Sequence, residues 1–505
     1  MNLSGLVFAG LVCSCLAQQT TASAQVIARL SEFPDGSEVQ GLTGESDPVI
    51  SADGRVAVFL GSGSIWAKHL DSGLLQRLGA GASSLGFGAA TALPGSLSAD
   101  GRYLAFASRT ETLVPGKSNR CPPTIINRAP GAQNPADIPC TDIFVWDLQT
   151  GRTVRILGPE GIERALESAV PMISGDGRWI VYTRVSGPPQ VLLHDREAGV
   201  TRIIGPVWDY FGSISDDGRR IAFVRNVQVG VESTKSVLVY DRVSGTTEVA
   251  DRRPTIQELV GAIPGSSPIP RISGDGRFLI FQALTGPIFI RDLDWNRTWE
   301  LTIRARDGAL PDKPALARGL SRDGRFVVFE SEGSHLVAND VLFGDAFVLD
   351  RFTGAIVRAS IGSNSSTPNG PSFDPSMSGD GTRVVFTSRA TNLLPDRPAS
   401  TTHNYLASLD RDGDAIQANF RFRTRGADAD PELSRIRLRS ASQNSALVWL
   451  RLVDAAGRSA SYPVRVPPRA TVVVPVTDLA DRPRERFILH VESDEPVFPG
   501  LVQPR

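Results

Sequence analysis

Short apolar runs of strand length, separated by polar turns, recur along most of this chain. One such unit reads Ile173-Ser174-Gly175-Asp176-Gly177-Arg178-Trp179-Ile180-Val181-Tyr182. An Asp-Gly pair between two apolar, β-branched runs is typical of a tight hairpin, because Gly adopts a positive φ at little cost and Asp can hydrogen-bond to its own turn backbone. The run after the turn, 178–183, has the length and composition of a strand buried on both faces.

This unit occurs seven times, with four matched positions in every copy. A Ser stands two residues before the Asp, an apolar residue three before it, and an aromatic residue six after it. The Asp residues of the seven copies are Asp53, Asp100, Asp176, Asp217, Asp275, Asp323 and Asp380. Ala52 and Ala99 stand where Gly175 does, so we expect Ala to be accommodated there, whereas Gly177 should need a positive φ.

A second hairpin follows in most copies, around an Asp that ends the third predicted strand. These residues are Asp71, Asp147, Asp195, Asp241, Asp292, Asp350 and Asp410. Each unit is therefore predicted to contain four short strands and no helix. A sheet of this kind cannot bury both faces alone, and radial stacking of several sheets around an axis solves the problem. The sequence predicts a β-propeller with seven blades.

Four of the seven copies carry an insertion between their second and third strands. The shortest interval between repeats, from Asp176 to Asp217, matches the roughly 40–45 residues of a bare blade. In a propeller, connections of this type all emerge on the face opposite the Asp-Gly turns. Insertions on one face often mark a binding face, although loops also accept insertions without any function. The four insertions are 109–141, 226–235, 331–344 and 389–403.

Two segments compete to complete the last blade. Residues 25–33 resemble the fourth strands of other units, and 414–419 directly follow the seventh repeat. We expect the N-terminal strand to close the ring, because a blade shared between both ends of the chain locks it. From residue 417 the repeat is absent and short apolar strands continue, which predicts a small antiparallel β-sandwich. The predicted fold is all-β: a seven-bladed propeller over 25–416, then a sandwich over 417–505.

The repeat resembles that of the TolB-type propellers, relatives of the WD-repeat propellers. The shared pattern is apolar-Ser-x-Asp-Gly-Arg-x-apolar-x-aromatic, and four copies keep a Pro five residues before the Asp: Pro48, Pro171, Pro270 and Pro375. The resemblance covers about residues 46–413 and implies the fold rather than a function. TolB has an α/β domain before its propeller that is absent here, so its role and partner are not carried over. The C-terminal segment resembles Ig-like modules of exported bacterial proteins at 453–457 and 493–497.

The N-terminal segment indicates export. Residues 1–24 carry no charged side chain, the apolar run 6–17 is too short to span a bilayer, and Ala22-Ser23-Ala24 fits a small-x-small cleavage site. We therefore expect 1–24 to be a signal peptide and the protein to be periplasmic or extracellular. The missing Lys or Arg near the N-terminus departs from the usual pattern, and lipoprotein processing at Cys15 is the alternative. No later segment has the length and apolar character of a membrane span.

Two cysteines, Cys121 and Cys140, remain after such processing, and they flank a loop in the second repeat. An even pair in an exported chain indicates a disulfide bond. A zinc site is the weaker alternative, because two thiols without a nearby His supply half of the ligands.

The chain shows few signs of catalysis. With 53 Lys and Arg against 54 Asp and Glu, its net charge of -1 gives no reason to expect nucleic acid as a partner. Gly-x-Ser-x-Gly and His-Glu-x-x-His motifs are absent, which argues against a propeller-linked peptidase. We assign no catalytic residue, metal or cofactor. The polar residues of two neighbouring insertions are the candidate binding residues, with a metal or acid–base site as a less favoured reading: His335, Asn339, Asp340, Asp345 and His403.

These patterns favour a non-catalytic, monomeric, exported scaffold that binds a protein or glycan of the cell envelope through the insertion face. The alternative is a propeller enzyme, of the polysaccharide lyase or hydrolase/lactonase type, with its site at the channel mouth. Such an enzyme normally gathers several His or carboxylate side chains there, and the chain contains only five His residues.

Overall fold

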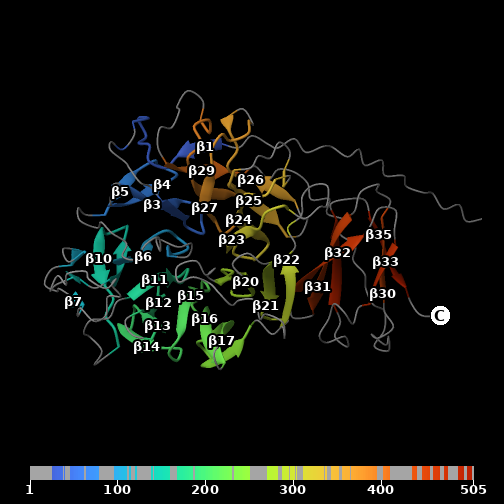
Figure 1. Cartoon of the computed structure of the whole chain (residues 1–505), viewed down its shortest axis with the longest axis horizontal. Coiled ribbons are helices and arrows are strands. Elements are labelled where there is room, and N and C mark those ends of the chain that lie inside the picture. The colour runs from blue at the N-terminus through green and yellow to red at the C-terminus, as the bar shows by residue number, and fades with distance from the viewer. Residues whose placement is uncertain are drawn as a thin grey trace, which may run out of the picture.

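The computed structural model describes residues 26–409 with gaps, and six further strands between 435 and 502. The longer gaps within the first part are 79–95, 122–137, 160–167, 251–269, 304–310 and 395–401. Throughout the described residues the secondary-structure elements are β-strands. Seven antiparallel sheets stand around a common axis, in chain order, as the blades of a propeller (Figure 1).

Six of the seven blades contain four antiparallel strands. Blade 1 consists of β2 (Ser46–Ile50), β3 (Val56–Gly61), β4 (Ser64–His69) and β5 (Leu75–Arg77). Blade 3 consists of β11 (Ser168–Ile173), β12 (Trp179–Arg184), β13 (Gln190–Asp195) and β14 (Val200–Ile203). Blade 4 consists of β15 (Asp209–Ile214), β16 (Arg220–Val229), β17 (Glu232–Asp241) and β18 (Thr246–Val249).

The remaining blades repeat this order. Blade 5 consists of β19 (Arg271–Ile272), β20 (Phe278–Gln282), β21 (Ile288–Asp292) and β22 (Arg297–Leu301). Blade 6 consists of β23 (Ala315–Leu320), β24 (Phe326–Ser331), β25 (Asp345–Asp350) and β26 (Ile356–Arg358). Blade 2 has three named strands, β6 (Tyr103–Ser108), β9 (Asp142–Asp147) and β10 (Arg152–Arg155), and the bridge from Leu97 to Leu104 marks its innermost segment.

Blade 7 combines both ends of the propeller. Its strands are β27 (Ser372–Met377), β28 (Arg383–Ser388), β29 (His403–Ser408) and, as the outermost strand, β1 (Val26–Arg29). β1 runs antiparallel to β29, with Val26 opposite Ser408. Lys68 of blade 1 donates to the carbonyls of Arg29 at 3.1 Å and Glu32 at 2.7 Å, which ties this strand to the next blade as well. The prediction that the N-terminal strand closes the ring is confirmed; the competing segment 414–419 lies outside the described residues.

The Asp-Gly turns have the geometry that the repeat predicts. The Gly of every turn has a φ between 66° and 75°. In blade 1, Ser51 Oγ donates to Asp53 Oδ1 at 2.6 Å, and the same carboxylate oxygen accepts the backbone N–H of Arg55 at 3.0 Å. Ser51 Oγ also accepts the N–H of Val56, the first residue of the next strand, at 3.0 Å. The Ser, Asp and Gly positions are therefore three parts of one turn.

Arginine links the two hairpins of a blade on the Asp-Gly face, a role that the sequence analysis missed. The Arg that follows the turn Gly forms an ion pair with the Asp at the end of the third strand, as Arg178 does with Asp195 at 2.8 Å. The same pair recurs as Arg102–Asp147, Arg219–Asp241, Arg277–Asp292 and Arg325–Asp350. The hairpin Asp residues are thus structural.

A closed ring of backbone hydrogen bonds joins all seven blades at this face, next to the axis. Each blade donates from its turn to the carbonyl of the next blade's turn, and blade 7 donates back to blade 1. The seven bonds run from Asp53 to Ala99, Ala99 to Gly175, Asp176 to Asp216, Asp216 to Gly274, Asp275 to Arg322, Arg322 to Gly379 and Gly379 to Ala52. These bonds fix each blade relative to its neighbours.

The core lies between adjacent blades. The repeated aromatic residue is at most 5% exposed in every blade: Phe59, Phe106, Tyr182, Phe223, Phe281, Phe329 and Phe386. Apolar side chains of one blade pack against those of the next, as Val58 of blade 1 does within a cluster that includes Phe106 and Trp146 of blade 2. Each sheet therefore buries both of its faces only because it has two neighbours.

The insertion in blade 4 is not the loop that the sequence suggested. β16 and β17 continue as a paired ladder through it, with Asn226 opposite Lys235 and Val229 opposite Glu232. We call this hairpin extension, 226–235, the arm. In blade 2 the insertion contains a small hairpin of β7 (Arg120–Cys121) and β8 (Ile138–Pro139), in which Cys121 lies opposite Ile138.

The C-terminal region forms two three-stranded antiparallel sheets, in the orders β33-β30-β35 and β32-β31-β34. The strands are β30 (Arg435–Ser440), β31 (Ala446–Asp454), β32 (Ser459–Val466), β33 (Thr471–Pro475), β34 (Phe487–Ser493) and β35 (Val497–Val502). Their assignment as an Ig-like β-sandwich stays a prediction. Among the residues that the structure describes, no helix is long and apolar enough to cross a membrane.

Candidate binding site on the insertion face

Two of the residues proposed from sequence are buried inside their blades. Asp345, the first residue of β25, is fully buried; it accepts a hydrogen bond from Ser360 Oγ at 2.7 Å and pairs with Arg358 Nε at 3.2 Å. His403, the first residue of β29, is buried edge-on against the ring of Tyr405. Both stand at ends of insertions and are buried within blades 6 and 7; the role of the candidate residues in binding stays a prediction.

Three other candidate residues and one cysteine of the predicted pair lie outside the described residues: His335, Asn339, Asp340 and Cys140. The Cys121–Cys140 bond therefore stays a prediction. Within the described part of the chain, no three His, Cys, Asp or Glu side chains gather closely enough to hold a metal ion.

His194 of blade 3 belongs to an interior contact between blades. Its Nδ1 lies 2.9 Å from Thr201 Oγ1, and that hydroxyl donates to the carbonyl of Leu157, which follows blade 2. Because the hydroxyl proton is used for Leu157, the imidazole must donate from Nδ1. Burial lowers the pKa of His194 to about 4, so the ring is neutral at pH 7. This side chain supports the fold.

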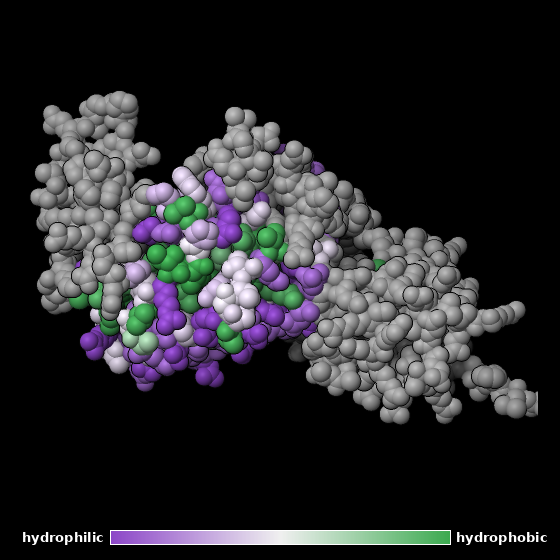
Figure 2. Space-filling model, turned by 90° about the horizontal axis from the view of Figure 1, so that it is seen from below, coloured by the Kyte–Doolittle hydropathy of each residue, from purple (hydrophilic) through white to green (hydrophobic). Residues whose placement is uncertain are grey.

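A different surface stands out on the insertion face of blades 2 to 4. Five large apolar side chains there are each more than a third exposed, and we call them the apolar rim: Leu157, Val185, Ile203, Val207 and Trp208. They stand where β10, β12 and β14 end and just before β15 begins. Figure 2 views the ring edge-on, from below in Figure 1, and shows apolar side chains set among polar ones on that side. Exposed apolar side chains that gather on one face of a folded protein often mark contact surfaces.

Trp208 is the most unusual residue of the rim. Its side chain is 50% exposed, and its φ is +76°, a conformation that a bulky side chain rarely adopts. Its N–H donates to the carbonyl of Pro189 at 2.6 Å, and its carbonyl accepts the N–H of Asn226 at 2.9 Å. Backbone contacts on both sides therefore hold an exposed indole in a conformation that costs about 1–3 kcal/mol.

The residues beside Trp208 anchor it firmly. Asp209 is fully buried and makes a two-bond ion pair with Arg225, each N–O distance being 2.8 Å. These bonds raise the pKa of Arg225 above its ordinary value. Tyr210 is partly buried, which raises its pKa to about 12, and its ring lies 5.7 Å from the ammonium of Lys235 at the base of the arm. In blade 4, Trp208 and the base of the arm are thus held by neighbouring contacts.

The sequence analysis missed this surface because it considered only the long insertions between strands as a candidate binding face. Trp208 lies in a short link between blades 3 and 4, not in one of the insertions. The available signal was the residue type: a Trp between two strands, in a link where polar turn residues are usual.

The fold resembles known propellers, although no protein-family model and no curated protein matches the chain. Similar solved structures include TolB from Acinetobacter baumannii, 13% identical over 74% of this chain and 79% of that one, with a TM-score of 0.35. They also include an oligogalacturonate lyase from Vibrio parahaemolyticus, at 12% identity, 76% and 94% coverage and a TM-score of 0.44. The propeller domain of the Trilobed protease from Pyrococcus furiosus matches at 13%, 74% and 96%, with a TM-score of 0.43. The chain is an all-β protein with a seven-bladed propeller.

Proposed function

We propose that this chain is a non-catalytic, exported propeller that binds a protein of the cell envelope through the apolar rim. The observation that carries the proposal is Trp208, an exposed indole held at a positive φ. Strained backbone persists where surrounding structure enforces it, and such positions concentrate at functional sites. Trp is also the side chain most enriched among residues that dominate protein–protein binding energy.

The composition of the rim favours a protein over a glycan. Its other members are aliphatic, and aliphatic side chains gain binding energy by covering the apolar side chains of another protein. The partner would contact a preorganised Trp208, because the Asp209–Arg225 pair fixes the residue next to it. Preorganisation reduces the entropy lost on binding.

A propeller enzyme acting on a polysaccharide or lactone is the second candidate. The observation that favours it is a cluster of charged side chains in blades 6 and 7. Arg318 Nη2 lies 2.6 Å from Glu330 Oε1 and 3.0 Å from Asp374 Oδ1. Carboxylates in a propeller channel are suitable groups for acid–base chemistry. Here both are engaged by an arginine, an arrangement that equally suits a structural ion pair.

The test of the proposed function compares Trp208→Ser with Val243→Ser in capture experiments from envelope extract. Val243 is a matched control, since it is 69% exposed but lies in a turn on the opposite, Asp-Gly face. We expect Trp208→Ser to lose a captured protein that the wild type and Val243→Ser retain. Retention of the same protein by all three variants would contradict the proposal.

A second variant separates lost binding from lost folding. Trp208→Gly removes the indole and also relieves the strained φ, because Gly adopts that conformation at little cost. We expect its thermal midpoint to equal or exceed that of the wild type while capture is lost. A lower midpoint together with lost capture would mean that Trp208 supports the fold rather than the contact.

A further inference from the structure

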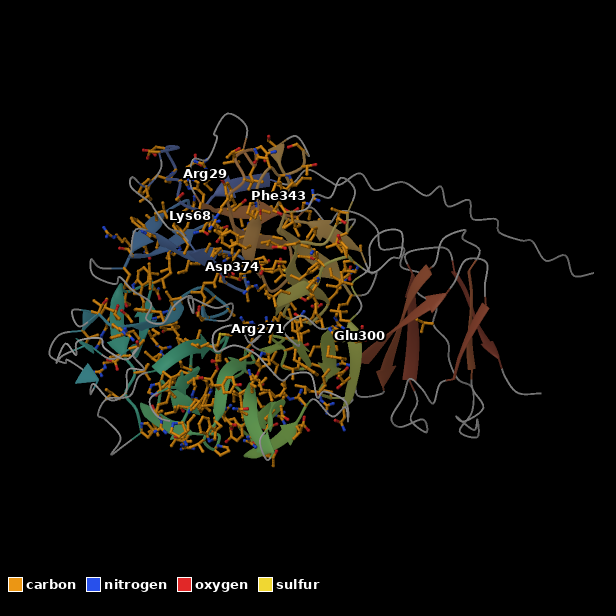
Figure 3. The ribbon with its side chains drawn as sticks, in the orientation of Figure 1. Arg29, Lys68, Arg271, Glu300, Phe343 and Asp374 are labelled. Atoms are coloured by element: carbon orange, nitrogen blue, oxygen red, sulfur yellow. The ribbon has the colours of Figure 1, made fainter. Side chains whose placement is uncertain are left out.

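Arg271 is a buried cation that the fold does not explain. It begins β19, the innermost strand of blade 5, and is only 7% exposed. Figure 3 shows Arg271 and Asp374 near the axis of the ring. The Nε of Arg271 donates to the carbonyl of Arg318 in blade 6 at 3.1 Å, while its buried Nη1 has no hydrogen-bond partner within the described part of the chain. A buried guanidinium nitrogen without an acceptor is costly.

The repeat does not require an arginine at this position. The equivalent residues, two before the turn Ser in the other blades, are Val49, Ser96, Met172, Ser213, Gly319 and Ser376. None of them is ionisable. Val49 and Met172 pack in apolar clusters between blades, and the other four copies have Ser or Gly. Arg271 therefore places a charge where the other blades have a small or apolar residue.

Two other buried arginines of the propeller have carboxylates nearby. Arg358 pairs with Asp345, and three aspartates stabilise the charge of Arg351 against burial. The charged neighbour that acts on Arg271 is instead another cation: burial, and then Arg318, lower the pKa of Arg271 to about 9. At pH 7 the side chain still carries its proton, so a positive charge is held in the interior without a counter-ion among the residues that the structure describes.

The neighbouring charges define what the missing counter-ion would be. Arg318 is paired with both Glu330 and Asp374, and the N–H of Asp374 donates to Glu330 Oε2 at 2.9 Å. Arg318 with its two carboxylates therefore carries a net charge of -1, whereas no carboxylate among the described residues forms an ion pair with Arg271. A doubly charged phosphate would be repelled by the two carboxylates. A carboxylate is planar, so its two oxygens can accept two parallel hydrogen bonds from one guanidinium. Its single negative charge balances the single positive charge of Arg271.

We propose that Arg271 anchors an anion site between the inner strands of blades 5 and 6, and that the group it binds is a carboxylate. The site is separate from the apolar rim, which lies on blades 2 to 4. The carboxylate can belong to a small organic acid or to a protein partner, since the recognised chemistry is the same. Binding supplies the counter-ion that the folded chain lacks, so it stabilises the fold in proportion to ligand occupancy.

The test measures the thermal midpoint of the full chain in sodium acetate against sodium chloride of equal ionic strength. We expect acetate to raise the midpoint of the wild type by a few degrees and to leave Arg271→Met unchanged. Without acetate, Arg271→Met should be at least as stable as the wild type, because an apolar side chain of similar length replaces an unpaired buried charge. Arg271→Lys keeps the charge but not the planar fork, and its response to acetate should be smaller.

Arg358→Met is the matched control. It removes an equally buried arginine that already has a carboxylate partner, so it should lower the midpoint and keep the acetate response of the wild type. An equal acetate response in the wild type and Arg271→Met, or none in either, overturns the proposal. If Arg271→Met does not fold, the acetate response of Arg271→Lys is compared with that of the wild type instead. A smaller response supports the site, and an equal response overturns the proposal.

Two further results identify the source of the carboxylate, and both support the site. If acetate competes with the protein captured from envelope extract and Arg271→Met weakens that capture, the carboxylate belongs to the partner. If acetate stabilises the chain while capture is unchanged, the ligand is a small organic acid.

Discussion

Replacing Gly177 with Ala tests how the turns hold neighbouring blades together. Gly177 has a φ of +73°, and a Cβ added there would stand 2.5 Å from Cδ2 of Tyr103 in blade 2. The Tyr103 ring has little room to move, because the guanidinium groups of Arg102 and Arg196 lie 4.8 and 3.9 Å from its centroid. The substitution therefore introduces both backbone strain and a steric clash.

The two costs can be separated with Gly151→Ala. Gly151 has nearly the same φ, +71°, but nothing lies within 4 Å of an added Cβ. An L-residue in the left-handed region costs about 1–2 kcal/mol, and overpacking costs a further 1–3 kcal/mol. We expect Gly151→Ala to lose only the first amount and Gly177→Ala to lose both, about 2–5 kcal/mol in all.

The assay is urea unfolding of both variants, with and without Tyr103→Ala. The midpoints report the stability difference as long as the slopes agree with that of the wild type. Removing the Tyr103 ring should abolish the excess loss of Gly177→Ala over Gly151→Ala, as expected for two residues in direct contact. Equal losses for the two glycine variants in the wild-type background would refute the contact between blades as the source of the cost.

Two further predictions follow from named contacts, and a third follows from the sequence. Lowering the pH from about 6.5 to 4 should cost about 2–3 kcal/mol at His194, because the unfolded chain binds a proton there before the folded one does; His194→Gln should flatten that part of a pH–stability curve. Gly175→Ala should destabilise the ring, since its Cβ would lie 2.6 Å from the Asp216 carboxyl carbon, and adding Asp216→Ala should restore the thermal midpoint. Mass spectrometry of the mature protein should find one Cys121–Cys140 bond, and two reactive thiols would contradict it.

The propeller was predictable because its repeat encodes local geometry. Ser51, Asp53 and Gly54 form one turn through contacts between residues close in sequence. The same three residue types therefore form the same turn in all seven copies. Closure by β1 was also predictable, since its sequence resembles the other fourth strands. Both predictions follow from local sequence patterns and do not depend on which side chains the neighbouring blades present.

The details that failed depend on neighbours that the repeat does not specify. Alignment with Ala52 and Ala99 suggested that Gly175 could become Ala, but the next blade presents Asp216 at that point, a side chain that the alignment cannot place. The inward orientation of Asp345 depends on the register of β25, which its position at the end of an insertion does not reveal. Trp208 was missed because it lies in a short link between blades 3 and 4, whereas the sequence analysis considered only the longer insertions.

Closure by β1 also determines the order in which the propeller can be completed. The strand made first, Val26–Arg29, pairs with the strand of blade 7 that is made last, Ser408 lying opposite Val26. During synthesis β1 must wait without its partner while six blades form, and an unpaired strand edge is prone to aggregate. We therefore expect the pairing of β1 with β29 within blade 7 to be the last part of the ring to form, and a chaperone that shields strand edges to act most strongly there.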